Sequence, residues 1–343
     1  MDDVRDSAAA LTPSKSSNIF LQIVEHLDGT ISRPFVPTTS ASASSKDVPL
    51  NPAHNTWLRL YLPHEGDAAE EEEKEEEKLL PIILYFHGGG FVLFGADSAI
   101  YDSPCAAMAA SVPALVVSLH YRLAPEHRLP AAYDDALDAL LWLRSQPTAA
   151  AAPEPWIARR GDFSRCFVMG SSSGANMAYH AALRFAADDS ETLTLRGLVL
   201  NQPYFGGAER TASEAASEDD FMLPLRANDM LWRLSLPPGA DRDHEFCNPL
   251  AAPRPPALRK LPRCFVKGCK GDPLIDRQRE FAQFLEGEGV EVVANLDDEG
   301  FHAIELFVPA KAEALFAEIR EFIYGDAALA TVGGGGVVES EAS

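Results

Sequence analysis

The sequence of 343 residues predicts an α/β protein built on one mostly parallel sheet that helices cover on both faces. Three observations support this prediction. Short apolar runs alternate with helical stretches along most of the chain. Two of these runs, residues 81–86 and 114–119, are apolar almost throughout, as expected of strands buried on both faces. Reactive side chains follow several of the runs, and ligands bind where such parallel strands end.

The N-terminal part is predicted to be peripheral. Residues 1–17 are polar and are expected to be flexible. Apolar residues between 19 and 27 predict a short amphipathic helix, and the segment 18–35 could lie over a pocket as a lid. Residues 30–35 form a possible first strand. The stretch 37–52 is rich in Ser, Thr and Pro and is expected to be a loop.

The elements that follow are predicted from their patterns in chain order. Alternation of apolar and polar residues predicts a strand at 56–62. Next comes an acidic loop, 67–78, in which Glu70–Lys78 carries seven Glu and two Lys. Like charges this dense repel each other, so a solvated insertion is favoured over a site for a basic partner. Further strands are expected at 81–86, 114–119, 165–169, 197–201, 264–268 and 290–296, and helices from Pro130, from Ala175, over 275–286 and over 310–324.

Residues 203–262 break this alternation. They are rich in Pro, Asp and Glu, with aromatic residues between them. We expect an inserted cap here and no separate domain, so that 18–324 forms a single domain. The tail 325–343 contains four consecutive glycines at 333–336 and is expected to be disordered.

The composition excludes several classes of partner. The formal net charge of −22 repels phosphate backbones and anionic lipid, so we expect neither nucleic acid nor membrane as a partner. Five scattered cysteines without a C-x-x-C pair favour free thiols over a disulfide framework or a zinc site. The polar N-terminus lacks the apolar core of a signal peptide, and no apolar run is long enough to span a bilayer. These features predict a cytoplasmic location.

The stretch Gly170–Gly174 (GSSSG) is the first candidate for chemistry. It lies between a predicted strand and a predicted helix, the setting in which G-x-S-x-G forms a nucleophile elbow. Such a turn brings two backbones close together and holds the central hydroxyl, Ser172, above the sheet edge. The alternative is a Ser/Gly-rich loop without a catalytic role.

A serine nucleophile needs a base within hydrogen-bond reach and a group that orients this base. His302 follows the last predicted strand, and of the nine histidines it alone has both the order and the position of a base for Ser172. Asp272 follows the strand at 264–268 and is the candidate acid, which would fix the His302 tautomer and stabilise its imidazolium.

Alternatives exist for the acid. Because Pro273 comes next, Asp272 could instead be a helix N-cap. Asp276 is the closest rival, but it falls inside the predicted helix. Residues 297–299 are acidic and precede His302, yet side chains this close in sequence rarely curl back onto the imidazole.

Acyl transfer also requires hydrogen-bond donors for the developing oxyanion. The N–H of Ser173, at the start of the helix, is one candidate. Gly88 and Gly89 would supply the others, in His87–Phe91 (HGGGF), directly after a buried strand. The alternative for these glycines is a tight turn between strand and helix.

These motifs together resemble the plant carboxylesterases of the hormone-sensitive-lipase-like group, which are relatives of the gibberellin receptors. The likeness covers about residues 19–324 and rests on five stretches: His87–Phe91, Tyr121–His127 (YRLAPEH), Gly170–Asn176, Gly271–Asp276 and Phe301–Ala303. It implies the α/β-hydrolase fold and a serine carboxylesterase that needs no metal or organic cofactor. It also implies Ser172 as nucleophile, Asp272 as acid and His302 as base, and a structural brace at Tyr121–His127.

The resemblance leaves the substrate and some alternatives open. The partner is expected to be a small-molecule ester, bound in a pocket for which the candidate residues are Phe91, Phe94, Phe205 and Phe221. Gibberellin receptors resemble esterases that have lost the triad histidine, so His302 argues against a hormone receptor. A dehydratase (lyase) similar to the 2-hydroxyisoflavanone dehydratases keeps a triad-like set and stays open.

Overall fold

The computed structural model describes residues 18–63, 79–148, 153–187 and 193–332. The predictions made for residues 1–17, for the acidic loop and for the glycine run therefore lie outside the described residues. Over the described part, no helix combines the length and the apolar character that a bilayer crossing requires. All five cysteines are free and buried.

The core of the structure is an eight-stranded sheet in the order β10-β9-β8-β7-β5-β6-β4-β3. The five pairings from β10 to β6 are parallel, and β4 and β3 are added antiparallel at one edge. The strands are β3 (Ser45–Asn51), β4 (Thr56–Tyr61), β5 (Leu80–Phe86), β6 (Leu115–His120), β7 (Gly161–Ser171), β8 (Leu195–Asn201), β9 (Cys264–Cys269) and β10 (Val292–Asp298). The predicted mostly parallel sheet is confirmed.

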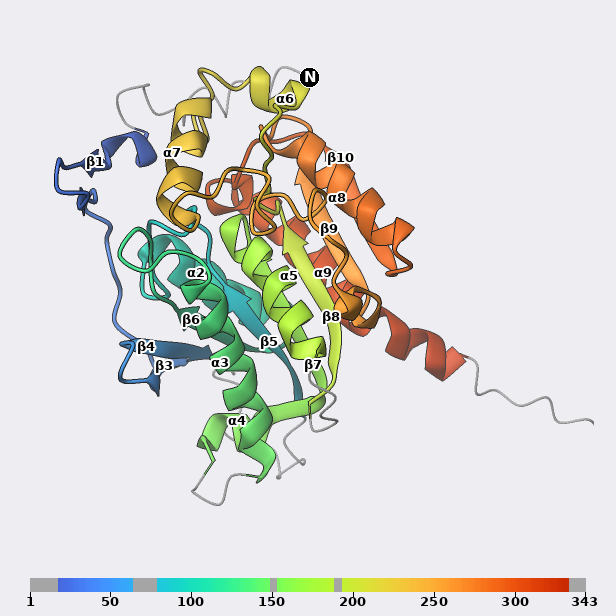
Figure 1. The fold of residues 1–343 in the computed structure, drawn as a ribbon. Helices are drawn as coiled ribbons and strands as arrows, with labels where there is room; N and C mark the ends of the chain where they lie inside the picture. The colour runs from blue at the N-terminus through green and yellow to red at the C-terminus, as the bar shows by residue number, and fades with distance from the viewer. Residues whose placement is uncertain (1–17, 64–78, 149–152, 188–192, 333–343) are drawn as a thin grey trace, which may run out of the picture.

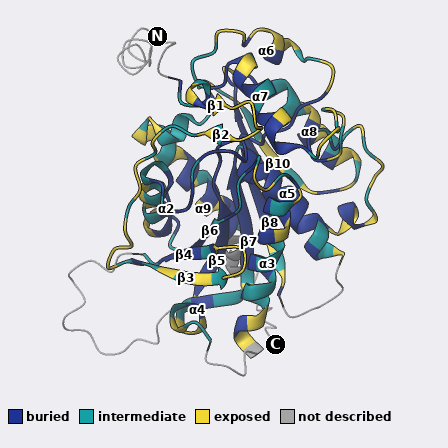
Figure 2. Ribbon diagram, turned by 60° about the vertical axis from the view of Figure 1, so that its left-hand side comes forward, coloured by how far each residue is buried: buried dark blue, intermediate teal, exposed yellow. Residues whose placement is uncertain are grey.

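Helices cover both faces of this sheet (Figure 1). Alternate residues of β5 divide between two apolar cores, with Ile82 and Leu84 in one and Ile83 in the other. The first core is closed by α3 (Ala131–Ser145), α5 (Ser173–Ala186) and α8 (Ile275–Gly287). The second is closed by α2 (Ala99–Ser111) and α9 (Pro309–Val332). Figure 2 shows the central strands in dark blue, with exposed residues on the edge strand β3.

The remaining elements are short. Between α3 and β7 lie η3 (Gln146–Thr148) and α4 (Pro155–Arg160). The predicted cap, 203–262, contains α6 (Ala212–Ala215), α7 (Leu225–Ser235) and η4 (Pro256–Lys260). Figure 1 shows α6 and α7 beyond the carboxyl ends of the strands.

The predicted helix at 19–27 is wrong. The segment forms a single 3₁₀ turn, η2 (Phe20–Gln22), and then a two-stranded ribbon of β1 (Val24–Glu25) and β2 (Ile31–Ser32). The apolar side chains do not share one face, because Phe20 is buried while Val24 and Leu27 are exposed. The Asn18 side chain fixes the turn by accepting hydrogen bonds from the Phe20 and Leu21 N–H groups.

Three further differences concern the extent of elements. Strand β3 lies inside the stretch that was predicted to be a loop, since pairing with β4 supplies the order that its polar sequence does not suggest. Helix α2 was not predicted at all. It contains Pro104 in its first turns and buries Tyr101, Cys105 and Met108. Helix α9 continues to Val332, through Gly325 and beyond the predicted end at Tyr324.

Candidate active site

Ser172 occupies a sharp turn between β7 and α5, with φ +55° and ψ −119°. Side chains are excluded at both ends of this turn. A Cβ on Gly170 would lie 2.0 Å from the Gly174 carbonyl oxygen, and one on Gly174 would lie 1.9 Å from the Phe86 carbonyl oxygen. The two glycines are therefore needed for helix α5 to start directly against β5 and to hold Ser172 in a conformation that L-residues rarely adopt.

Replacing Gly174 by Ala is expected to lower the free energy of unfolding by about 3 kcal/mol, since the backbone of α5 or β5 must move to admit the methyl group. Equilibrium unfolding in urea measures the loss. The matched control is Gly287→Ala at the end of α8, where an added Cβ meets nothing within 4 Å. There the change should be neutral or stabilising, by at most about 1 kcal/mol. Equal unfolding free energies for the two variants would contradict the packing argument.

The structure brings Ser172, His302 and Asp272 together. The Ser172 hydroxyl lies 2.9 Å from Nε2 of His302, and Nδ1 of the same ring lies 2.9 Å from Oδ2 of Asp272. His302 and Asp272 are buried residues that are 5% and 1% exposed. An ionised Asp272 accepts a hydrogen bond from the Nδ1–H group of His302, so Nε2 carries no proton and can accept a hydrogen bond from the Ser172 hydroxyl.

Asp272 makes two further hydrogen bonds. Its Oδ1 accepts from the Leu274 N–H at 2.9 Å, and Oδ2 also accepts from Nε2 of Gln278 at 2.8 Å. One carboxylate oxygen therefore stabilises the turn before α8, while the other orients His302. The alternative that Asp272 is the N-cap is wrong, because α8 begins at Ile275 and its N-cap is Leu274.

The rival acids lie elsewhere. Asp276, in the first turn of α8, accepts from the Ser213 N–H at 2.8 Å. Asp297 pairs with Arg279, and Asp298 pairs with Lys267. Glu299 is largely exposed and lies 3.7 Å from Lys270. Each of these carboxylates thus has a partner other than His302.

Backbone contact sets the distance between the acid and base loops. A Cβ on Gly271 would lie 2.3 Å from the Gly300 carbonyl oxygen. The loop after β9 and the loop after β10 therefore touch through their backbones, one residue before Asp272 and two residues before His302. This contact leaves no room for a side chain at Gly271, and at Gly300 a Cβ would lie 2.9 Å from Sγ of Cys269.

The surroundings of His302 favour its protonated form. Burial lowers the pKa of this imidazole, but the charge and hydrogen bond of Asp272, with the nearby carboxyls of Glu305 and Asp220, outweigh burial, so the pKa is raised above its ordinary value of 6.5. A raised pKa strengthens His302 as a base, and it requires a pH above this pKa for the base to be neutral.

The predicted oxyanion donors lie beside Ser172. Ser173 is the first residue of α5, so its N–H has no acceptor within the helix. A Cβ on Gly88 would lie 3.2 Å from the Ser172 Cβ, and Gly89 lines the same cavity as Ser172 and His302.

Tyr101, which was not predicted, lies beside one of these donors, since a Cβ on Gly88 would lie 2.6 Å from the Tyr101 hydroxyl oxygen. Burial raises the pKa of the Tyr101 phenol, and the neighbouring Gly88 backbone acts against this rise.

The Tyr121–His127 stretch braces the loop that carries these glycines. The Tyr121 ring stacks on the His87 ring with centroids 4.2 Å apart, and its hydroxyl donates to the His87 carbonyl oxygen at 3.0 Å. Arg122 binds Asp135 of α3 through Nε and Nη2. The Ala124 N–H donates to the Phe91 carbonyl. These contacts hold the glycine loop in place, and they do not involve Ser172, His302 or Asp272.

A cavity of about 420 Å³ opens onto Ser172 and His302. Its wall is almost entirely apolar and comes from the N-terminal segment, the loop before α2, the cap and the loop after His302. The lining residues are Asn18, Ile19, Phe20, Val36, Pro37, Gly89, Phe94, Ala99, Ile100, Tyr101, Ser172, Phe221, Met222, His302, Ala303, Leu306 and Phe307.

Two of the four predicted pocket residues, Phe94 and Phe221, line this cavity, and the other two do not. Phe91 packs against Tyr133, Tyr204 and Trp232 in the core. Phe205, at the start of the cap, is buried against Tyr179 of α5 and Phe281 of α8. The positions of these four residues near the sheet edge in the sequence did not show whether each ring faces the cavity or the core.

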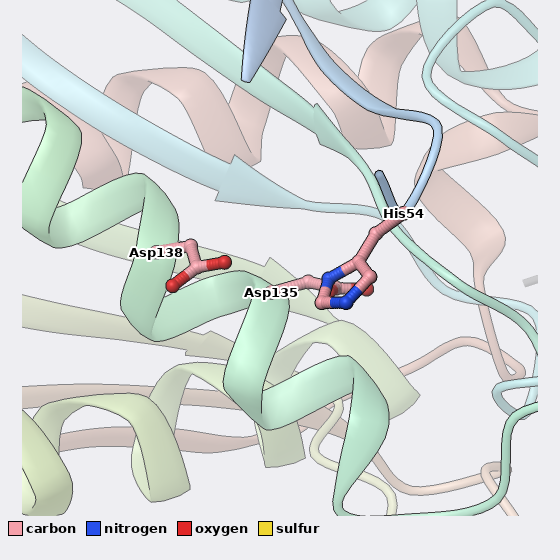
Figure 3. A group of neighbouring side chains, drawn as sticks. All are labelled: His54, Asp135 and Asp138. Atoms are coloured by element: carbon pink, nitrogen blue, oxygen red, sulfur yellow. The ribbon is translucent and has the colours of Figure 1, made fainter. Parts of the chain in front are cut away.

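Among the described residues, one group of His, Asp and Glu side chains has the spacing of a metal site: His54, Asp135 and Asp138 (Figure 3). The Asp135 carboxylate already accepts hydrogen bonds from the backbone N–H and the guanidinium of Arg122 at 2.7–3.0 Å. The Arg122 guanidinium is a cation that already pairs with this carboxylate, and its charge disfavours a metal ion at the same place. The Asp135 carboxylate therefore belongs to the brace formed by Tyr121–His127.

Comparisons with known proteins agree with this geometry. Residues 83–306 match a protein family described as having the alpha/beta hydrolase fold. The chain is 43% identical to "Probable carboxylesterase 8" of Arabidopsis thaliana, over 91% of this chain and 94% of that protein. It is 46% identical to "3-O-acetylpapaveroxine carboxylesterase CXE2" of Papaver somniferum, over 86% and 95%. Among solved structures, it is similar to an esterase of Pyrobaculum calidifontis, with a TM-score of 0.69 and 26% identity over 85% of this chain and 87% of that one.

Proposed function

Because this chain belongs to the α/β-hydrolase fold family and, within it, to the plant carboxylesterases, we propose that it hydrolyses small, uncharged carboxylic esters through an acyl-enzyme formed on Ser172. The observation that carries the proposal is the position of His302, which lies 2.9 Å from the Ser172 hydroxyl on one side and 2.9 Å from Asp272 on the other.

In the acylation half-reaction, Oγ of Ser172 attacks the ester carbonyl carbon while Nε2 of His302 takes the hydroxyl proton. The carbonyl oxygen becomes an oxyanion and accepts hydrogen bonds from the N–H groups of Gly89 and Ser173, with the Gly88 N–H as a third donor. Asp272 stabilises the imidazolium. As the tetrahedral intermediate collapses, the C–O bond to the alcohol breaks and His302 protonates the departing alkoxide.

Deacylation repeats these steps with water as the nucleophile. His302 removes a proton from the water molecule, whose oxygen attacks the acyl carbon of the ester on Ser172. The second tetrahedral intermediate releases the carboxylic acid, and the Ser172 oxygen recovers its proton from His302. The net reaction consumes one water molecule and yields one acid and one alcohol, and it involves only the three side chains and the backbone donors.

The cavity wall favours an uncharged substrate. No Lys, Arg, Asp or Glu is among the residues that line it, so a charged group there would lose its hydration without gaining an ion pair. Its volume of about 420 Å³ lies at the small end of ligand pockets. The poppy relative, named for an O-acetyl ester, supports the same type of bond.

The purified protein is therefore expected to hydrolyse the p-nitrophenyl ester of monomethyl adipate at least about 100-fold faster, in kcat/KM, than the p-nitrophenyl ester of adipate itself. The two acyl groups have similar length and differ in the charge at the far end, so the ratio reports the cost of placing a carboxylate in the cavity. Release of p-nitrophenol follows both reactions.

Equal rates, or a preference for the anion, would contradict an apolar acyl site. A folded protein that turns over neither ester would instead favour the receptor or the dehydratase alternatives, and a binding screen with uncharged small molecules would then follow.

A further inference from the structure

Gln202 lies directly after β8 and reaches the base loop from the neighbouring strand end. The residue is 2% exposed and has a left-handed backbone, with φ +46°. Its side-chain amide makes two hydrogen bonds that enclose His302: Nε2 donates to the Phe301 carbonyl at 3.0 Å, and Oε1 accepts from the Ala303 N–H at 2.5 Å. The base is thus held on both sides by a residue 100 positions earlier in the chain.

The same short segment also holds the nucleophile. The Ser172 N–H donates to the Asn201 carbonyl at 2.9 Å, and the Tyr204 N–H donates to the Ser172 carbonyl at 3.1 Å. The Gln202 N–H itself donates to the Lys267 carbonyl of β9, the strand that leads to Asp272. Residues 201–204 therefore contact all three parts of the chain from which the triad is built.

An amide is the side chain that this position requires. His302 lies in a loop before the short 3₁₀ turn η5 (Ile304–Leu306), and Ala303 is itself left-handed, with φ +61°. Besides the bond from Gln202, the Phe301 carbonyl accepts a longer one from the Ile304 N–H at 3.3 Å, and the Ala303 N–H donates to Gln202. Glutamine supplies a donor for the carbonyl and an acceptor for the N–H, whereas a carboxylate offers acceptors alone and an apolar side chain offers neither.

We propose that Gln202 is a positioning residue for the esterase reaction: it holds the His302 loop so that Nε2 stays within hydrogen-bond distance of the Ser172 hydroxyl. The inference rests on the proposed function for the roles of Ser172 and His302. Displacement of a base by about 1 Å costs on the order of 100-fold in rate, so loss of both hydrogen bonds should appear in kcat.

The first test replaces Gln202 by Met, which has similar length and cannot make either hydrogen bond. Hydrolysis of p-nitrophenyl acetate should show kcat lowered about 100-fold, with KM changed less than threefold. Active sites are counted by stoichiometric labelling with a p-nitrophenyl phosphonate, so that kcat refers to folded protein.

The matched control is Gln146→Met. Gln146 is also a buried glutamine whose amide holds two backbone groups, since it donates to the Trp142 carbonyl at 3.1 Å and accepts from the Glu154 N–H at 2.9 Å. It lies at the end of α3, away from the triad. Gln146→Met should lower the thermal midpoint about as much as Gln202→Met while leaving kcat per active site unchanged.

Gln202→Glu supplies a second readout. It keeps an acceptor for the Ala303 N–H and places a negative charge beside His302, which favours the imidazolium. In a plot of kcat/KM against pH, the acidic limb, where the rate falls as His302 is protonated, should therefore move to higher pH, and the plateau should be lower. In Gln202→Met the acidic limb should not move to higher pH. A residue that only stabilised the fold would leave the position of the limb unchanged.

Full kcat in labelled Gln202→Met protein, or an equal loss in Gln146→Met, would overturn the inference. If Gln202→Met does not fold, Gln202→Glu decides the question. The inference would be overturned if this variant had the same acidic limb and the same plateau of kcat/KM as the parent. Failure of the proposed function is measured separately, in Ser172→Ala. If this variant hydrolysed the ester at the parental rate, the proposed function would be wrong, whatever the Gln202 variants show.

Discussion

Replacement of Ser172 by Ala is expected to lower kcat for p-nitrophenyl acetate by about 10⁵–10⁶-fold, because the variant has no hydroxyl to form the acyl-enzyme. His302 and Asp272 would remain in place, and their hydrogen bond does not involve the serine. The oxyanion donors are backbone groups and survive the change, so a residual rate of about 10³–10⁴-fold over water is expected.

The fold should tolerate this change. The Ser172 Oγ has His302 as its hydrogen-bond partner, and the left-handed backbone is equally strained with Ala as with Ser. The free energy of unfolding should therefore stay within about 0.5 kcal/mol of the parental value. Stopped-flow release of p-nitrophenol should show a burst in the parent and none in the variant.

Ser164→Ala is a suitable control for Ser172→Ala. Ser164 is exposed on β7, far along the same strand, and donates its hydroxyl to Asp162. This variant should keep the parental kcat and burst. Turnover retained in Ser172→Ala, at more than about one hundredth of the parental rate, would mean that another group carries the chemistry.

The parts of this site that the sequence predicts are those governed by short-range constraints. Gly170, Ser172 and Gly174 are close in sequence and the turn leaves no room for other residues, so the motif is recognisable without a structure. His302 and Asp272 each follow a strand, and parallel strands bring such positions to one edge. The sheet itself is predictable because strands buried on both faces are apolar throughout.

The parts that could not be predicted depend on contacts between distant segments. The turn at Phe20 is fixed by Asn18, whose amide also donates to the carbonyls of Phe221 and Met222 in the cap. Gln202 looks like any polar residue after a strand until the Phe301 and Ala303 backbone groups are placed beside it. No local pattern encodes such pairings.

The direction in which an aromatic side chain points is another property of this kind. Phe91 and Phe94 are three residues apart, and both have a left-handed backbone, yet Phe91 enters the core and Phe94 lines the cavity. Hydrophobicity predicts that each is covered. Which residues cover each ring depends on the positions of the cap and the N-terminal segment. These segments have no regular hydrophobic periodicity, so their positions cannot be predicted from the sequence.

Replacement of Asp272 by Asn is expected to lower kcat by about 10⁴-fold, because it reverses the tautomer of His302. The Leu274 N–H requires an oxygen at the position of Oδ1, so the amide nitrogen of Asn would face His302. That nitrogen donates to Nδ1, which leaves the proton on Nε2, directed at Ser172. His302 would then donate to the nucleophile when it should accept its proton.

The structure can absorb this change without unfolding. Gln278 now donates to Asp272 through Nε2, and its Oε1 has no hydrogen-bond partner among the described residues. Rotation of the Gln278 amide would present this oxygen to the new Asn nitrogen and satisfy both groups. The loss of activity in Asp272→Asn should therefore occur in folded protein, with a thermal midpoint close to that of the parent.

The pH profile gives an independent check of the same assignment. Ester hydrolysis needs neutral His302, so kcat/KM falls as the pH decreases through the pKa of this residue, which in the parent is raised above 6.5. Without the Asp272 charge, burial dominates and lowers that pKa. The acidic limb of Asp272→Asn should therefore lie at lower pH than that of the parent.

Asp276→Asn is the control that separates the two candidate acids. Asp276 is four residues away, on the first turn of α8, and Asn can still accept from the Ser213 N–H. Its kcat should stay within about twofold of the parental value and its acidic limb should not move. A large loss in Asp276→Asn, with Asp272→Asn active, would transfer the role of acid to Asp276. This outcome would require the α8 turn to rotate toward His302, against the hydrogen bonds that now hold Asp272 there.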